Sequence, residues 1–371
     1  MRVGVLTTSY PRTPSDYAGA FVADRVRALL ERGHEVDVLA AGAGAPLGTT
    51  RDGRLTLTRL PASLADGRDL FAGAGAPEAL EREGARAAWA ALRFSAELTA
   101  AAFARAPRWD RVESHWLAPC ALAAVAATPG LPHRAVAHSG DVALLERVPF
   151  GRSFARLLAR SGAEIVFVSE ALRRRFAALA GGVHGVVEPM STSPHIFSTT
   201  VASRAERATG NPTVVSVGRL VPIKGLDLLV RACAPRAGDV APIQLVLVGD
   251  GPERARLRDL AARLGVPLTL TGVVPREEVP TWLRAADLYA QPSRNLANGR
   301  TEGMPLATLE ALAAGMPVVV SDSGGLAELP ARGARVRVVP AGDVSALARA
   351  LRAGLSERSV PDAGGRIVTA V

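Results

Sequence analysis

The sequence has little cysteine and few aromatic residues, and each shortage excludes a class of protein. Two cysteines, Cys120 and Cys233, stand far apart among 371 residues. A disulfide-braced secreted fold is therefore not expected, and a cytoplasmic location fits better. Aromatic side chains make up 4% of the chain. The stacked aromatic surfaces that bind single-stranded nucleic acid are not expected either, so we predict no nucleic-acid partner.

Motifs for metal binding, secretion and membrane crossing are also missing. There is no D-x-D pair, and the six histidines are dispersed without the spacing of a zinc site. We therefore predict neither a metal nor another cofactor. The opening MRVGVLTTSYP turns polar after six residues, which argues against a signal peptide. The alanine-rich runs are cut by proline and glycine too early to span a membrane.

Positive charge is in excess. The chain has 44 Lys and Arg against 35 Asp and Glu, a formal net charge of +9. Such an excess favours anionic partners, including nucleotide phosphates and anionic membrane surfaces. No basic amphipathic anchor stands out in the sequence, so the charge predicts no more than a weak attachment to the inner face of a membrane.

Two sets of short apolar strands divide the chain. The first set lies at 3–6, 36–40, 55–60, 111–114, 134–138 and 164–169, and the second at 212–218, 243–251, 268–272, 287–293, 317–322 and 335–340. Strands that alternate with helical patterns predict parallel sheets covered on both faces. We therefore predict an α/β fold of two Rossmann-like, doubly wound domains, 1–195 and 205–371, facing each other across a ligand cleft. A linker rich in Ser, Thr and Pro would join them at about 190–210.

One helix of the second domain has the features of an anion site at its start. In RTEGMPLATLEALAAGMP, residues 300–317, Pro305 suits the first helical position because it has no N–H to leave unpaired. The helix would follow a strand, at the carboxyl edge of the sheet where ligands collect. The N–H groups of Gly303, Met304 and Leu306, together with the helix dipole, would then face an anion.

Two carboxylates bracket this helix start. Glu302 precedes it, and Glu310 lies one turn after Leu306, from where its side chain leans back toward the same opening. A buried carboxylate needs hydrogen-bond donors. The hydroxyls of a ribose would supply them for Glu310, and those of a hexose for Glu302. A surface glutamate on an Ala- and Leu-rich helix explains the pattern equally well.

Three further patterns also fit a ligand that contains phosphate and sugar groups. Gly218, Arg219 and Lys224 follow the first strand of the second domain, and two cations there suit a diphosphate. His138 ends a strand of the first domain and could donate to a sugar hydroxyl. Gly19 lies in a small-residue turn before the first helix, which would let backbone N–H groups approach a phosphate. Taken singly, solvated loop cations, a structural histidine and a simple tight turn remain alternatives.

Together and in order, these motifs resemble a large family of retaining, nucleotide-sugar-dependent glycosyltransferases with the GT-B architecture of two Rossmann-like domains. The resemblance covers most of the chain, and within these enzymes it is to glycosyltransferase family 4. It rests on Gly19, RGHEV at 32–36, His138-Ser139-Gly140-Asp141, VSEALRRRF at 168–176, VGRL with Arg219 and Lys224, VGDGP at 248–252, and an E-x7-E pair formed by Glu302 and Glu310.

The resemblance implies a role for each of these residues. Arg219 and Lys224 would hold the donor diphosphate, Glu302 the transferred sugar and Glu310 the ribose, while His138 would lie beside the sugar. The remaining expected substrate contacts are Gly19, Asp141, Gly218, Val273, Gly303, Met304, Pro305 and Leu306.

The sequence departs from the family pattern in three places. Ala18-Gly19-Ala20 replaces paired glycines, and Ser139 replaces a glycine after the histidine. The chain stops at GGRIVTAV, where the family continues into helices that return to the first domain. Domain closure is therefore open to question.

We accordingly expect a retaining, metal-independent glycosyltransferase. It would move a hexose from a nucleotide-sugar, a UDP-sugar in the first place, to a hydroxyl of a saccharide, lipid-linked or small-molecule acceptor. Without an enzymatic nucleophile, we expect front-side displacement in which the leaving phosphate accepts the acceptor proton. Two alternatives are an epimerase of the same architecture and a non-catalytic sugar-nucleotide-binding subunit. A nicotinamide dehydrogenase is disfavoured because no G-x-G-x-x-G follows the first strand.

Overall fold

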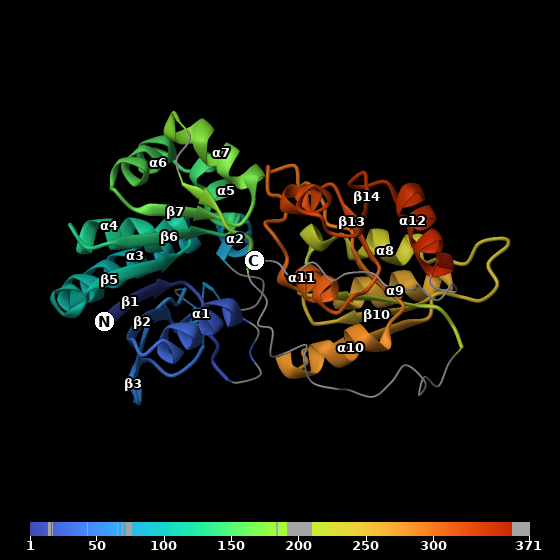
Figure 1. Ribbon diagram of the computed structural model, residues 1–371, viewed down its shortest axis with the longest axis horizontal. Coiled ribbons are helices and arrows are strands. Elements are labelled where there is room, and N and C mark those ends of the chain that lie inside the picture. Colours follow the sequence, from blue (N-terminus) through green and yellow to red (C-terminus); the bar gives the residue numbers. More distant parts are fainter. Residues whose placement is uncertain are drawn as a thin grey trace. The chain divides into compact units, whose positions relative to one another are not determined.

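The chain forms two compact α/β units, Met1–Pro189 and Met190–Val371 (Figure 1). The structure is a computed structural model that describes residues 1–13, 16, 18–42, 44–64, 66–68, 70–71, 76–182, 185–190 and 210–357. The predicted linker at about 190–210 lies almost entirely outside the described residues, and so does the C-terminal stretch after residue 357.

The first unit is built on an eight-stranded sheet in the order β3-β4-β2-β1-β5-β6-β7-β8. Its strands are β1 (Arg2–Thr7), β2 (Glu35–Ala41), β3 (Gly48–Asp52), β4 (Leu55–Leu60), β5 (Arg111–His115), β6 (His133–Ala137), β7 (Glu164–Phe167) and β8 (Val186–Val187). Its helices are α1 (Ala20–Glu31), α2 (Ala76–Glu83), α3 (Ala85–Arg105), α4 (Leu122–Ala127), α5 (Gly140–Arg147), α6 (Gly151–Arg160) and α7 (Glu170–Ala180).

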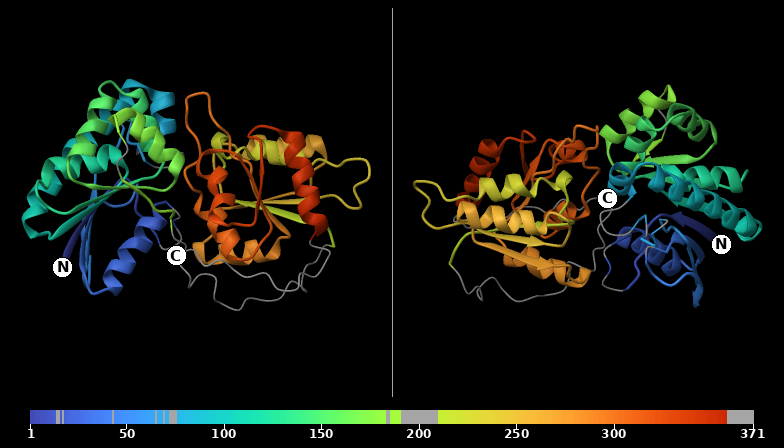
Figure 2. Two further views of the ribbon diagram at one scale, coloured as in Figure 1. Left: turned by 45° about the horizontal axis from the view of Figure 1, so that its top comes forward. Right: turned by 180° about the vertical axis from the view of Figure 1, so that it is seen from behind.

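Apolar side chains of the central strand β1 point alternately to the two faces of this sheet, which explains why helices cover both faces. Val3 and Val5 of β1 pack in one core cluster with Val22 and Val26 of α1. Leu6 points the opposite way, into a second cluster built with α3 and α4. Successive side chains of a strand face opposite sides of the sheet. Helices therefore lie on each side of the strands in both views of Figure 2.

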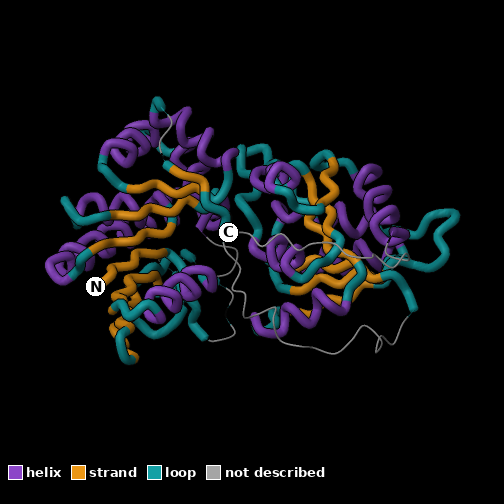
Figure 3. The backbone as a smooth tube through the Cα atoms, in the orientation of Figure 1, coloured by secondary structure: helices purple, strands orange, loops and turns teal. Residues whose placement is uncertain are grey.

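The second unit has a six-stranded, all-parallel sheet in the order β11-β10-β9-β12-β13-β14. Its strands are β9 (Thr213–Val217), β10 (Gln244–Val248), β11 (Leu268–Gly272), β12 (Leu288–Gln291), β13 (Val318–Ser321) and β14 (Val336–Val339). Its helices are α8 (Leu226–Ala232), α9 (Arg254–Leu264), α10 (Val279–Ala285), α11 (Leu306–Ala313) and α12 (Val344–Glu357). Figure 3 shows the strands of each unit enclosed by helices.

In each unit the strand order reverses beside the first strand. The chain runs from β1 to β2 on one side and later returns to β5 on the other, and it does the same around β9 with β10 and β12. Doubly wound sheets bind ligands at this switch point, in the crevice outside the carboxyl ends of the strands. The loops after β1, β5, β9 and β12 are therefore the places to look for a site.

The predicted parallel α/β architecture is confirmed, with two local corrections. The strand β3 was not predicted; it forms an antiparallel hairpin with β4 through a turn at Gly53, where φ is 53°. Pro305 is the cap of α11 and not its first residue, because its ψ of 123° is extended. Its carbonyl accepts the first hydrogen bond of the helix, from the Thr308 N–H at 3.1 Å.

Candidate active site

Lys224 and Glu302 meet at the switch point of the second unit. Lys224 ends a 3-10 turn, Pro222–Lys224, after β9, and Glu302 lies in the loop between β12 and α11. Because β9 and β12 are neighbours in the sheet, these two loops leave the same edge. The Lys224 Nζ lies 3.1 Å from Glu302 Oε2, and both side chains are largely buried. The structure thus brings together the residues predicted for the diphosphate and for the sugar.

Lys224 is the one lysine of the chain; the other 43 of the 44 basic residues are arginines. An ammonium is a compact, rotatable point charge, whereas a guanidinium is a planar fork. The single ammonium lies against a buried carboxylate. This position therefore indicates a site that requires a compact positive charge and not a planar one.

A chain of buried hydrogen bonds runs from helix α11 to Glu302. The Thr308 hydroxyl donates to the Tyr289 hydroxyl at 3.4 Å, and Tyr289 donates to Gln291 Oε1 at 2.9 Å. Gln291 Nε2 donates to Ser293 Oγ at 2.9 Å, and Ser293 donates to Glu302 Oε2 at 3.0 Å. The four donors are fully buried. We call these five residues the relay.

Every hydrogen bond of the relay points toward the carboxylate. Burial raises the pKa of Tyr289 above its usual value, so this hydroxyl stays protonated and can donate. Since a hydroxyl has one proton, each donor fixes the direction of the next bond. Glu302 Oε2 consequently receives Ser293 on one side and Lys224 on the other, which fixes the carboxylate in one orientation.

Tight glycine contacts hold the backbone around this pair. An ideal Cβ at Gly324 would lie 1.8 Å from the Glu302 carbonyl oxygen, and φ at Gly324 is 54°. The Gly325 N–H donates to the Gly303 carbonyl at 2.9 Å. Gly218 has a φ of 149°, and its ideal Cβ would lie 3.5 Å from Cε of Lys224. A side chain at position 218 would thus touch the lysine, so the glycine leaves its path clear.

Glu310 lies in α11 with a side chain only 7% exposed, and its partner is a residue that sequence reasoning missed. Arg276 Nη2 lies 3.5 Å from Glu310 Oε1. Arg276 stands three positions after Val273, in the loop that leaves β11. That position at the carboxyl end of a strand was the signal available in the sequence. Val273 itself is 52% exposed, so a ligand can reach it.

The start of α11 retains the features of the predicted anion site. Within the described residues, the N–H groups of Gly303, Met304 and Leu306 have no hydrogen-bond partner. The Met304 side chain is buried, so only its backbone could serve a ligand. Arg219 directly follows Gly218, and its carbonyl accepts from the Val221 N–H at 3.0 Å. That Arg219 binds diphosphate stays a prediction.

The first unit gathers aromatic rings around His138, at the carboxyl ends of its strands. Nδ1 of His115, at the end of β5, lies 3.2 Å from Nε2 of His138. The ring centroids of Phe21 and Trp116 lie 4.6 Å and 5.0 Å from that of His138. Burial and the neighbouring His115 hold the pKa of His138 well below its usual value. A neutral imidazole can donate one hydrogen bond, which suits a sugar hydroxyl.

Backbone strain surrounds this histidine. Trp116 and Ser139 are non-glycine residues with φ of 72° and 127°. Side chains rarely adopt such angles, and these outliers concentrate at functional sites. At 139 the resembled family has a glycine, which tolerates the same backbone conformation without strain. Ser139 therefore holds, under strain, a backbone conformation that a glycine would adopt freely.

The carboxylate of Asp141 organises this loop. Its carboxylate accepts hydrogen bonds from the backbone N–H groups of Leu117 at 2.8 Å, Ser139 at 3.0 Å and Val142 at 3.0 Å, with longer bonds from His138. The residue is 2% exposed. Burial raises the pKa of Asp141, against the effect of these four donors. This geometry gives Asp141 a positioning role in the loop, and the substrate contact that we expect of it stays a prediction.

Gly19 is required by the fold of the first loop. Its φ is 73°, and an ideal Cβ would lie 2.3 Å from the carbonyl oxygen of Ser9. Its own carbonyl accepts the first hydrogen bonds of α1, from Val22 at 2.9 Å and Ala23 at 3.1 Å. The loop after β1 therefore passes unusually close to the start of α1. Whether this backbone also contacts a ligand stays a prediction.

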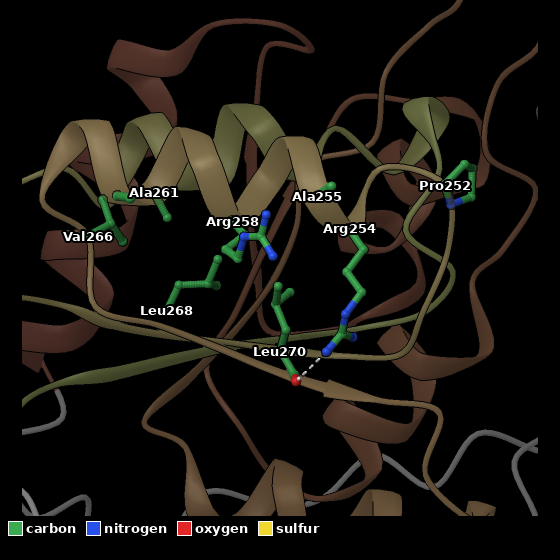
Figure 4. Close-up of a pocket in the computed structure, with 9 residues that line it drawn as sticks. Pro252, Arg254, Ala255, Arg258, Ala261, Val266, Leu268 and Leu270 are labelled. Carbon is green, nitrogen blue, oxygen red and sulfur yellow. Dashed lines mark hydrogen bonds between the residues drawn. The ribbon is translucent and has the colours of Figure 1, made fainter.

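A separate hollow of about 630 Å³ lies between α9 and the edge strand β11. Figure 4 shows Arg254 and Leu270 in it, joined by a 3.2 Å hydrogen bond from Nη2 to the Leu270 carbonyl. None of the predicted site residues lines this hollow, so we place no chemistry in it.

Neither a metal-binding cluster nor a membrane-spanning helix is present among the described residues. No group of three or more His, Cys, Asp or Glu side chains there could hold a metal ion. Of the helices in the same ranges, none combines the length and the apolar character needed to cross a bilayer.

Comparison with known proteins identifies the class of protein. The chain resembles the solved sucrose-phosphate synthase from Thermosynechococcus elongatus with a TM-score of 0.74 at 19% identity, over 97% of this chain and 90% of that chain. At that identity the likeness shows the fold alone, which is the GT-B fold of two Rossmann-like units.

Two family profiles then define the family. The profile described as Glycosyltransferase Family 4 matches residues 18–187, and the one described as Glycosyl transferases group 1 matches residues 211–357. The chain therefore belongs to the family-4-like glycosyltransferases, as its motifs predicted.

The curated relatives include mannosyltransferases. The GDP-mannose-dependent alpha-(1-6)-phosphatidylinositol monomannoside mannosyltransferase of Mycobacterium tuberculosis is 38% identical over 190 residues, 49% of each chain. A monoacylated-substrate counterpart from Corynebacterium glutamicum is 29% identical over 270 residues, 68% of this chain and 70% of the relative. The matched stretch thus spans about half the length of the first relative.

Proposed function

We propose that this protein transfers a sugar from a nucleoside-diphosphate donor to an acceptor hydroxyl, with retention of the anomeric configuration and without a metal ion. The observation that carries the proposal is the 3.1 Å contact between Lys224 and Glu302 at the switch point of the second unit. The pair offers a cation for the leaving phosphate and, beside it, a carboxylate for the sugar.

The neighbouring groups extend this arrangement to the rest of the donor. The diphosphate would bind Lys224, Arg219 and the N–H groups at the start of α11. Charge that develops on the leaving phosphate during bond cleavage would be stabilised by these preorganised groups. Glu302 would accept hydrogen bonds from the sugar and Glu310 from the ribose. The leaving phosphate would accept the acceptor proton on the same face of the sugar, which gives retention.

GDP-mannose is the donor that we propose to test first. The sequence alone led us to expect a UDP-sugar, and that expectation stays untested. The two curated relatives described above are named as GDP-mannose-dependent enzymes. Membership of one family with them supports a guanosine diphosphate donor more directly than the shared fold supports a uridine diphosphate.

We further propose a lipid-linked acceptor that already carries a sugar. The names of the same relatives specify phosphatidylinositol mannosides as acceptors. In this chain the acceptor would bind the first unit beside His138, where aromatic rings can stack on a sugar face. Phe21 and Trp116 supply such rings within 5.0 Å of the imidazole centroid.

The test is transfer of radiolabelled mannose from GDP-mannose to phosphatidylinositol monomannoside, with UDP-glucose as a second donor and with EDTA present. We expect a labelled lipid whose new linkage is α, formed equally well in EDTA. Glu302→Gln should abolish most of the transfer. The control Glu277→Gln removes an exposed carboxylate from the neighbouring 3-10 turn Arg276–Glu278 and should leave transfer unchanged.

Other outcomes separate the alternatives. Formation of an altered sugar without any acceptor would show an epimerase. Donor binding without turnover, for either nucleotide and with several acceptors, would show a non-catalytic subunit. Activity that EDTA removes and Mg²⁺ restores would contradict the metal-independent mechanism.

A further inference from the structure

Helix α6 of the first unit exposes an apolar stripe next to a basic one. Phe150, Leu157 and Phe154 are 77%, 50% and 38% exposed. They recur at the three- and four-residue spacing that aligns side chains on one helical face. Exposed apolar clusters of this kind mark interaction sites more often than isolated surface side chains do.

The opposite edge of the same exposed surface carries three arginines. Arg152, Arg156 and Arg160 recur every four residues and are all exposed. The face turned to the protein consists of Gly151, Ala155 and Leu158, which are buried. The helix therefore has three stripes, one packed on α5 and α7, one apolar and one basic.

No ion pair among the described residues neutralises the positive charge of this helix. The segment from Pro149 to Ser161 contains no acidic residue. The glutamates of the packing helices α5 and α7 already bind other arginines. Glu146 of α5 accepts from Arg175 at 2.9 Å, and Glu170 of α7 accepts from Arg173 at 2.7 Å. Within the described residues, the three arginines of α6 form no ion pair, so their charge is available to a partner.

The backbone holds Phe150 outward at some cost. Phe150 caps α6 with φ of 62°, a left-handed conformation that bulky side chains rarely adopt. The next residue must be glycine, because an ideal Cβ at Gly151 would lie 1.7 Å from the Leu145 carbonyl oxygen. An exposed phenylalanine in a strained position is not needed for the core. Such strain is retained more often at functional positions than elsewhere.

We propose that α6 docks this protein on an anionic membrane surface. An interfacial helix presents large apolar residues to the headgroup–acyl boundary and arginines to lipid phosphates. The three exposed apolar side chains and the three unpaired arginines fit both requirements. A second copy of the chain is disfavoured as the occupant, because a two-fold contact through this face would bring like charges together.

This docking surface was not evident from the sequence. The pattern GRSFARLLAR reads as an ordinary amphipathic helix whose apolar side is buried. The structure shows that the buried side is made of small and single apolar residues, which leaves Phe154 and Leu157 outside. Docking goes beyond the proposed function and does not depend on it, because it needs neither donor nor acceptor.

The test is sedimentation of the full chain with vesicles, without any nucleotide-sugar or acceptor. Vesicles of phosphatidylcholine alone are compared with vesicles of equimolar phosphatidylcholine and phosphatidylglycerol. We expect binding to the anionic vesicles only, weakened by added salt. Each arginine near an anionic surface accounts for about a fivefold change in affinity, so R152Q/R156Q/R160Q should lose about a hundredfold. F154S/L157S should lose about tenfold or more.

A matched control separates this helix from the general charge of the chain. R256Q/R258Q/R263Q removes the same three charges from exposed positions of α9 and should keep most of the binding. Equal losses in the two triple variants would overturn the proposal, and so would wild-type protein that ignores anionic vesicles. Dimerisation that F154S/L157S abolishes would overturn it in favour of a protein contact. Melting temperatures near that of the wild type verify that the variants are folded.

Discussion

Ser293→Ala is the sharpest perturbation of the candidate site, because Ser293 touches Glu302 and no predicted ligand atom needs it. Its hydroxyl donates to Glu302 Oε2 at 3.0 Å and accepts from Gln291 Nε2 at 2.9 Å. The substitution removes both hydrogen bonds and little volume. Among the described residues, Lys224 is then the one remaining side-chain contact of the Glu302 carboxylate. The carboxylate can therefore rotate toward the ammonium and away from the expected position of the sugar.

The magnitude follows from the kind of bond lost. A hydrogen bond to a charged group contributes about 1.5–3 kcal/mol. If that energy orients Glu302 in the transition state, turnover should fall roughly 10- to 150-fold. The Gln291 amide is left buried without an acceptor, which should lower the free energy of unfolding by about 1–3 kcal/mol. Affinity for free nucleotide should stay within about twofold, because the relay does not reach Glu310.

The assay is single-turnover transfer at saturating donor, with nucleotide affinity measured by calorimetry and stability by urea denaturation. Ser321→Ala is the matched control. Ser321 is also buried, and its hydroxyl donates to the backbone carbonyl of Ser293 at 2.5 Å. It should lose stability without the loss in turnover. Equal turnover for Ser293→Ala and wild type would refute the reasoning, and so would equal losses in turnover for the two variants.

Three further predictions concern individual side chains. Glu310→Gln should weaken binding of the free nucleotide diphosphate by about 1.5–3 kcal/mol, whereas Glu302→Gln should leave it nearly intact; calorimetry showing the reverse would mean that their roles are exchanged. His138→Ala should lower turnover with little change in melting temperature, and a large loss of stability with normal turnover would show a structural role instead. Burial lowers the pKa of His115 from 6.5 to about 4, so below pH 6.5 the unfolded chain takes up a proton that the folded imidazole does not. The free energy of unfolding should therefore fall as pH drops from about 6.5 toward 4, by at most about 1.4 kcal/mol per pH unit for this group. Urea denaturation of His115→Gln should show a shallower slope, and an unchanged slope would contradict the prediction.

The sequence was sufficient to predict a strand where one local pattern of residues determines the structure. The β-branched runs of β9, β10 and β13 are buried on both sides and could only form central strands. The strand β3, GTTRD, was missed because it is exposed throughout and has no apolar side chain. Its pairing depends on the two-residue turn Gly53-Arg54 and includes the Thr49–Thr58 hydroxyl contact of 2.9 Å. Hydrophobic periodicity reports neither feature.

The candidate site was predicted only in part, for a similar reason. Lys224 and Glu302 could be found because each follows a strand end within a recognisable motif. Their mutual contact depends on β9 and β12 being neighbours, which the strand order of a doubly wound sheet implies but the motifs do not state. Gln291 and Tyr289 look like ordinary strand residues in the sequence. Their role in the relay arises from burial, which forces their polar atoms to pair.

A chain with one lysine carries one side-chain amine. The other basic side chains are arginines and histidines, which formaldehyde and borohydride do not convert to stable N-methyl amines. A deprotonated amine is converted, so the reaction is confined to Lys224 and the α-amino group of Met1. Reductive methylation with ¹³C-formaldehyde would thus place one spectroscopic label inside the chain, at the Nζ that contacts Glu302. Its methyl resonance would report donor, free nucleotide and sugar separately, and its rate of labelling would report how far each of them shields the site. The single lysine thus provides a specific attachment point at the candidate site without any mutation.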